Sequence, residues 1–136
     1  MPSFDFTALL TFLMSLFEAL KKLAEKLGYI YVDTGAIYRT IGLATKLRGV
    51  DAGDSAAVIA LLPKLVIELS YNEAGEQVML LDGADVSRDI RLPEVSMLAS
   101  KVSAIPEVRA FLVDMQRDMA RRHDVIMDGR DIGTVI

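Results

Sequence analysis

The sequence predicts an α/β fold with two parallel strands in one sheet, helices on its faces, and a small antiparallel insert. Residues 29–32 and 125–127 are short apolar segments that each enter a turn, which predicts the parallel strands. Residues 65–71 and 77–81 alternate in polarity, and the five residues between them include Asn and Gly. That spacing is typical of a hairpin. Helical segments fill most of the intervening chain, as expected where parallel strands are joined by crossovers.

The composition indicates a globular chain that forms one domain or part of one. It has 136 residues, of which 52% are hydrophobic and 25% charged, enough to bury a core. A net charge of −4 argues against binding to nucleic acid or to an anionic membrane, which requires a basic surface. The absence of cysteine excludes disulfides, thiolate metal sites and cysteine nucleophiles, and fits a cytoplasmic location.

The N-terminal part differs in character from the rest. Residues 6–17 are a nearly unbroken apolar run, shorter than the roughly 20 residues that span a bilayer. Residues 1–5 lack the positive charge of a secretory signal. Apolar residues continue at helical spacing as far as Gly28: Leu16, Leu20, Leu23, Ala24 and Leu27. We expect a divergent apolar helix over residues 1–21, continuing to residue 27, that is either buried or promotes self-association.

Residues 29–39 predict a strand, a sharp turn and a helix. Asp33 or Thr34 can cap a helix that runs over residues 35–47 and closes at residues 48–49. Arg39 lies one turn into this helix, behind a hydroxyl and a glycine at its mouth. Helix N-termini attract phosphate, and arginine adds a bidentate fork, so the segment has the parts of an anion site. A capped junction with a solvated arginine explains the same local pattern equally well.

Further elements follow in the region before Pro93. Asp54 and Ser55 start a short helix over residues 56–62, which ends before Pro63. After the hairpin, Asp82-Gly83 forms a second turn, and residues 84–87 predict a short third strand.

Two prolines mark the start of the last helices, which cover residues 93–103 and 106–122. The apolar side of the first is assigned to Val95, Met97, Leu98 and Val102. The core stripe of the second is assigned to Val108, Phe111, Leu112, Met115 and Met119.

Three segments of the chain match, in order, motifs of one enzyme family. They are residues 33–39 (DTGAIYR), 100–109 (SKVSAIPEVR) and 128–134 (DGRDIGT). Together they resemble the bacterial cytidylate kinases, over about residues 22–136. The resemblance implies a single, incomplete domain: a partial P-loop nucleoside-monophosphate-kinase core, in which residues 65–91 correspond to the insert of the monophosphate-binding region.

The resemblance also implies a reaction and its residues. Such enzymes transfer the γ-phosphoryl of ATP to CMP or dCMP, with Mg-ATP as co-substrate and no tightly bound cofactor. The catalytic residues carried over are Arg39 and Arg130, which hold the monophosphate, and Asp128 on the magnesium side. The substrate-binding residues carried over are Thr34, Gly35, Tyr38, Arg39, Ser100, Arg109, Gly129, Arg130 and Asp131. Ser100, Arg109 and Asp131 would read the cytosine edge, because a carboxylate accepts from its amino group and Arg or Ser donates to its acceptors.

The chain departs from the family in its donor half. No glycine precedes Gly28 and no Gly-Lys pair occurs, so the phosphate loop that cradles ATP is absent. The family's arginine-bearing lid would follow Ile136. No cofactor-binding or metal-binding residue is therefore assigned, and His123 has no second His or Cys near it. We expect weak or no kinase activity; the alternatives are a non-catalytic nucleotide-binding remnant and a partner-dependent interaction module. Ser100 as an ordinary helix hydroxyl, and Arg130 and Asp131 as a surface turn pair, remain simpler readings of those residues.

Overall fold

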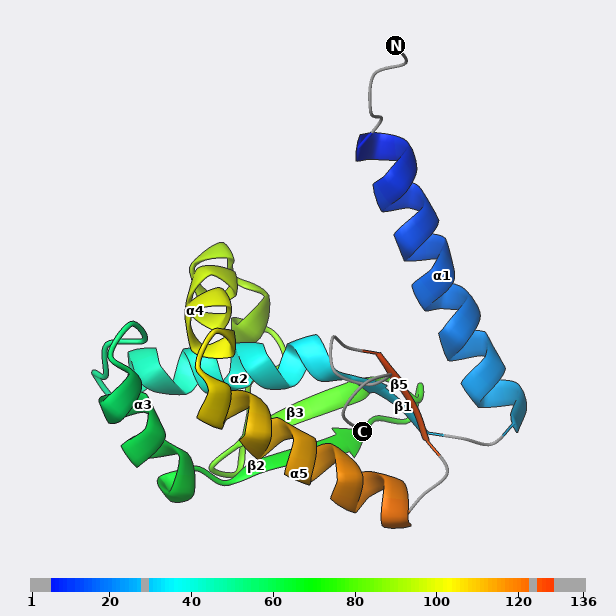
Figure 1. The fold of residues 1–136 in the computed structure, drawn as a ribbon. Helices are drawn as coiled ribbons and strands as arrows, with labels where there is room; N and C mark the ends of the chain where they lie inside the picture. Colours follow the sequence, from blue (N-terminus) through cyan, green and yellow to red (C-terminus); the bar gives the residue numbers. More distant parts are fainter. Residues whose placement is uncertain (1–5, 28–29, 123–124, 129–136) are drawn as a thin grey trace.

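The computed structural model describes residues 6–27, 30–122 and 125–128, which form helices, two sheets and two short 3-10 turns (Figure 1). In chain order the elements are α1 (Phe6–Leu27), β1 (Ile30–Asp33), α2 (Thr34–Leu47), α3 (Ser55–Leu61), η1 (Leu62–Lys64), β2 (Ile67–Tyr71), β3 (Gln77–Leu81), β4 (Ala84–Asp85), η2 (Asp89–Arg91), α4 (Pro93–Ser103), α5 (Pro106–Arg122) and β5 (Val125–Asp128). The α/β fold expected from the sequence is confirmed.

The first sheet is the parallel pair β1–β5. Ile30 pairs with Val125 and Asp33 pairs with Asp128, so the two strands run in register and end at the same edge. The parallel arrangement expected from the sequence is confirmed, with β1 shifted by one residue from the expected 29–32. Val32 is fully buried, which fixes one face of this sheet against the core.

The second sheet is the antiparallel insert β2–β3–β4, as expected. In the first loop Gly75 adopts φ +78°, and the Asn72 side-chain oxygen accepts from the Glu76 N–H. In the second, Asp82 and Gly83 adopt φ 52° and 85°, the left-handed pair that a two-residue hairpin requires. Strand β4 is shorter than the expected 84–87.

Strand β4 ends early because side chains take over part of its hydrogen bonding, although the Val86 N–H still donates to the Met79 carbonyl at 3.0 Å. The Asp85 carboxylate accepts from the Ser87 N–H at 2.9 Å, which turns the chain away from β3. The Ser87 hydroxyl then accepts from the Met79 N–H at 3.0 Å, in place of a strand carbonyl. Hydrogen bonds to the Asp85 carboxylate from the backbone and side chain of Ser87 hold the pKa of Asp85 below its usual value.

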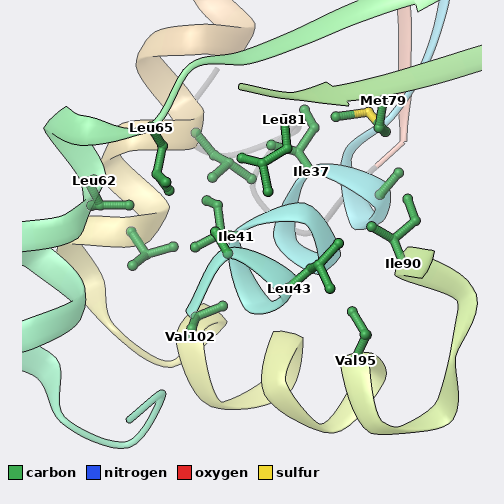
Figure 2. Close-up of a cluster of buried hydrophobic side chains, with 14 of the residues drawn as sticks. Ile37, Ile41, Leu43, Leu62, Leu65, Met79, Leu81, Ile90, Val95 and Val102 are labelled. Carbon is green, nitrogen blue, oxygen red and sulfur yellow. The ribbon is translucent and has the colours of Figure 1, made fainter. Parts of the chain in front are cut away.

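Helix α2 is the centre of the core (Figure 2). Ile37 and Ile41 are fully buried, between β3 on one side and α4 on the other. Two threonines are buried on the same helix. Their hydroxyls are not left unpaired, because each donates to a carbonyl one turn earlier. Thr40 donates to Ala36 and Thr45 to Gly42.

Helix α4 approaches α2 closely at Gly42. A Cβ atom built on Gly42 would lie 2.9 Å from the Ala99 nitrogen and 3.1 Å from the Leu98 carbonyl carbon. Both are backbone atoms, which cannot swing away as a side chain can. Glycine at position 42 therefore sets the spacing of the two helices.

Helices α4 and α5 have the predicted bounds, and α5 buries the predicted stripe. In α4 one assignment is wrong: Met97 is 68% exposed, whereas Val95 and Val102 are fully buried. Positions 95, 99 and 102 share one face of a helix, and position 97 lies two residues away, on the opposite side. Ala99 occupies the place assigned to Met97.

Helix α1 is a single helix, and its first turns project away from the body of the molecule (Figure 1). Among its residues with described burial, Ala24 is buried, while four large apolar side chains stay exposed: Phe12, Leu16, Leu23 and Leu27. They follow the spacing i, i+4, i+11 and i+15, which places them on one face. The excess of apolar surface expected from the sequence is present and uncovered. Among the described residues, no helix is long and apolar enough to cross a membrane.

Candidate functional site

The candidate site begins where β1 ends and α2 starts. Asp33 has extended backbone angles, and its side-chain oxygen accepts from the Ala36 N–H at 3.4 Å. Of the two residues that the sequence offered as caps, Asp33 is therefore the N-cap. Thr34 is the first residue of the helix and is buried, and Gly35 is half-buried beside it.

The guanidinium of Arg39 returns to this helix mouth. A Cβ atom built on Gly35 would lie 3.9 Å from Arg39 Nη2 and 3.2 Å from Asp33 Oδ1. The absence of a Cβ at Gly35 thus leaves this position, close to both the carboxylate and the guanidinium, unfilled. Because the cap already occupies the Ala36 N–H, the positive charge available to an anion at this mouth comes chiefly from Arg39.

Arg39 takes part in neither of two ion pairs that join described residues near the far end of its helix. One joins Lys46 to Glu94, and the other joins Arg48 to Asp82 at 3.0 Å. Both lie at the opposite end of α2 or beyond it. The Val66 N–H and the Arg48 guanidinium together hold the pKa of Asp82 below its usual value. These pairs link α4 and the insert to the C-terminal end of α2. They do not involve Arg39 at its N-terminal end.

The second strand of the sheet ends beside this mouth. Asp128 is the last residue of β5 and is the register partner of Asp33. The segment that follows Asp128 therefore begins at the edge where α2 starts. Gly129, Arg130 and Asp131, which the sequence assigned to the monophosphate and the base, lie outside the described residues, as does His123.

The remaining predicted site residues lie on three helices around the same core. Tyr38 is half-buried on α2 and packs against the hydrophobic core. Ser100 is exposed on α4, one residue beyond the close contact of Ala99 with Gly42. Its carbonyl accepts from the Ser103 hydroxyl at 3.0 Å. Arg109 is half-buried in the first turns of α5. Ser100 thus follows directly after Ala99, the residue of α4 that contacts α2, and α2 is the helix that also carries Arg39.

One residue at the site was missed by the sequence interpretation. Gln77, the first residue of β3, accepts from the Asp33 N–H at 2.9 Å and donates to the Asp33 carbonyl at 3.2 Å. No local pattern could have indicated this contact, because the two residues are 44 positions apart. Tyr71 is the register partner of Gln77, and burial raises its pKa to about 12, so it adds no charge here at neutral pH.

A parallel strand pair whose carboxyl ends meet at a helix mouth, with an antiparallel insert packed on that helix, is the arrangement of part of an α/β nucleoside monophosphate kinase. The family model for cytidylate kinase matches residues 19–136. The chain therefore belongs to the cytidylate kinase family.

Curated relatives carry the same name. The chain is 48% identical over 116 residues to the cytidylate kinase of Lactobacillus johnsonii, covering 85% of this chain and 50% of the relative. It is 49% identical to that of Caldicellulosiruptor saccharolyticus, with 85% and 51% covered. It is 43% identical to that of Flavobacterium johnsoniae, with 85% and 52% covered. The chain spans about half the length of these relatives. The match starts at residue 19, close to the start near residue 22 that the motifs indicated.

Proposed function

We propose that this chain forms the acceptor half of a cytidylate kinase and binds CMP or dCMP at the mouth of α2. The observation that carries the proposal is the return of Arg39 to the open space at Gly35, where its Nη2 atom is 3.9 Å from the position of a Cβ atom. A monophosphate there would receive the bidentate donors of Arg39, and Arg130 would supply the second cation. Thr34 and Tyr38 lie in the first turns of the same helix.

The base would lie toward α4 and α5. In this proposal Ser100 and Arg109 donate to the acceptors of the cytosine edge, and Asp131 accepts from its amino group. Cytosine offers one donor and two acceptors on that edge, so a carboxylate beside two donors matches it and mismatches uracil. An unmatched buried polar group costs about 1–3 kcal/mol, which is enough to discriminate the bases.

Phosphoryl transfer from Mg-ATP is the reaction to which this acceptor half belongs. Catalysis of this step rests on positioning and charge neutralisation, which Arg39 and Arg130 would provide for the acceptor. Asp128, the register partner of Asp33, is the residue that would serve the magnesium side, because Mg²⁺ prefers carboxylate ligands. Residues 1–27 contain no glycine for a phosphate loop and the chain contains no Gly-Lys pair. We therefore expect the 136-residue chain to bind CMP and to show weak or no turnover.

Calorimetry with CMP and with cytidine tests the acceptor half. We expect CMP to bind more tightly than cytidine, and Arg39→Ala to reduce CMP affinity by roughly tenfold or more, as for loss of a charged hydrogen-bonding pair. Arg88→Ala, an exposed arginine in the turn before η2, is the matched control and should change nothing. Equal losses in the two variants would overturn the phosphate site.

A coupled assay of CDP formation with Mg-ATP tests the donor half. We expect no turnover above background at saturating CMP. Turnover that disappears in Arg39→Ala would show that the chain has a working donor site, and the expectation of a non-catalytic remnant would be wrong.

A further inference from the structure

The free edge of β1 is held by one side chain. Among the described strands, β1 is hydrogen-bonded to β5 alone. In a β-strand the N–H and C=O of one residue point to the same side. Both groups of Asp33 are bonded to the Gln77 amide, at 2.9 Å and 3.2 Å. The primary amide carries a donor and an acceptor, so it replaces the peptide group of a neighbouring strand.

The Gln77 side chain is itself fixed. Its Nε2 atom lies 3.2 Å from the Met79 sulfur, and Met79 is buried in the core. Gln77 is half-buried and stands at the first paired position of β3. The amide therefore links the backbone of Asp33 to a strand of the insert that is anchored in the core.

The position of Asp33 governs the helix mouth in turn. Its carboxylate caps α2 at the Ala36 N–H and lies 3.2 Å from the place of a Gly35 Cβ, and Arg39 Nη2 lies 3.9 Å from the same place. A shift of the Asp33 peptide would move the cap and change the space at Gly35. Displacements of about 1 Å in positioning groups are costly in sites of this kind.

We infer that Gln77 is a positioning residue for phosphate binding: it locks the β1–α2 junction so that Gly35 and Arg39 keep the anion site open. This inference rests on the proposed binding of CMP. Gln77 does not touch the nucleotide in this account; it acts through Asp33.

The molecule provides a matched control at the other end of the insert. Asp82 accepts from the Val66 N–H and from Arg48 Nη2, each at 3.0 Å, and so ties the insert to the C-terminal end of α2. Loss of this link would loosen the insert without disturbing the mouth of α2. Arg48→Met therefore separates a general effect of the insert from a specific effect of Gln77.

The test compares Gln77→Leu, Gln77→Glu and Arg48→Met in the full 136-residue chain. Amide hydrogen exchange by NMR needs no ligand and should show faster exchange at the Asp33 and Ala36 amides in Gln77→Leu but not in Arg48→Met. Titration should show CMP affinity falling by about tenfold in Gln77→Leu, with cytidine affinity changed by less than about twofold. Gln77→Glu keeps an acceptor for the Asp33 N–H but sets a carboxylate oxygen against the Asp33 carbonyl and adds a negative charge, so its CMP affinity should fall at least as far as in Gln77→Leu.

Each outcome decides the inference. An equal loss of CMP affinity in Arg48→Met, or a parallel loss for cytidine, would show that Gln77 only stabilises the insert. Unchanged exchange at Asp33 and Ala36 in Gln77→Leu would refute the link through the junction, and since that measurement follows single amides, a general loss of stability would be seen at core amides too. A wild-type chain that binds CMP no better than cytidine would refute the proposed function, and the exchange rates would then decide the Gln77 link by themselves.

Discussion

Helices α1 and α2 are both rich in apolar residues, yet α2 is largely buried and α1 leaves large apolar side chains exposed. Nine of the fourteen residues of α2 are buried, because the helix lies between β3 and α4. In α1, Ala24 alone is buried among the residues whose burial is described, and Leu16, Leu23 and Leu27 remain exposed. An apolar stripe therefore predicts a helix, whereas its burial depends on what the rest of the fold places against it.

Polar contacts hold both ends of α2. The N-terminal end of α2 is capped by Asp33 and held through Gln77, and its C-terminal end is linked to Asp82 through Arg48. Side chains from distant parts of the chain thus fix both ends of the helix that carries Arg39. This is the precision that an anion site requires, because its donors must not reorganise when the ligand binds.

Truncating one buried and one exposed side chain should give the largest difference. Ile41 is fully buried in α2, so Ile41→Ala should lower the free energy of unfolding by about 2–5 kcal/mol. Leu23 is 46% exposed in α1, so Leu23→Ala should cost less than about 1 kcal/mol. Urea unfolding followed by circular dichroism measures both. Similar losses would mean that α1 is packed as tightly as α2.

The contact of α2 with α4 should reverse the usual effect of a helix substitution. In an exposed helix, Gly→Ala stabilises by about 0.5–1 kcal/mol. At Gly42 the new Cβ would meet the Ala99 nitrogen at 2.9 Å, so Gly42→Ala should instead destabilise by about 1–3 kcal/mol. The sign is the test, again by urea unfolding. A stabilised variant would show that α4 moves freely away from α2 and that Gly42 does not set their spacing.

Local signals predicted most of the elements. Pro93 and Pro106 start α4 and α5 at the expected residues, because proline at a first helical turn is a signal that few other structures produce. The Asp82-Gly83 turn was also predictable, because a turn with two consecutive left-handed residues strongly favours the sequence Asp-Gly. The observed bounds of β1, α2 and α3 differ from the expected ones by one residue, which is the usual uncertainty of element boundaries.

Tertiary contacts set what local signals could not. Strand β4 stops at Asp85 because the Ser87 hydroxyl replaces a backbone acceptor, a choice that depends on where Met79 lies. Met97 is apolar and is predicted to lie in the core, but its angular position on α4 directs it away from α2, so it is exposed. Gln77 gave no signal at all, since its importance comes from a contact with a residue 44 positions away.

The motif match assigned candidate site residues that geometry alone would not have selected. Ser100 is an exposed helix serine and Arg109 a half-buried arginine, and neither has a local feature that marks it. Arg39 differs, because the glycine and cap ahead of it predict an anion site from the residues themselves, and its guanidinium does lie at that mouth. The roles of all three remain proposals that the binding experiments test.

The smallest expected effect concerns the uncovered face of α1. Exposed apolar stripes favour association, so we expect the average mass in sedimentation equilibrium to rise with protein concentration. Replacing two stripe residues together, Leu16→Glu and Leu23→Glu, should remove that rise. Leu47→Glu changes an even more exposed leucine on α2 and should not. If Leu47→Glu acts as strongly, association is a general property of exposed leucines. If the wild-type chain stays monomeric at high concentration, exposure of the stripe costs too little to drive assembly, and self-association through α1 is refuted.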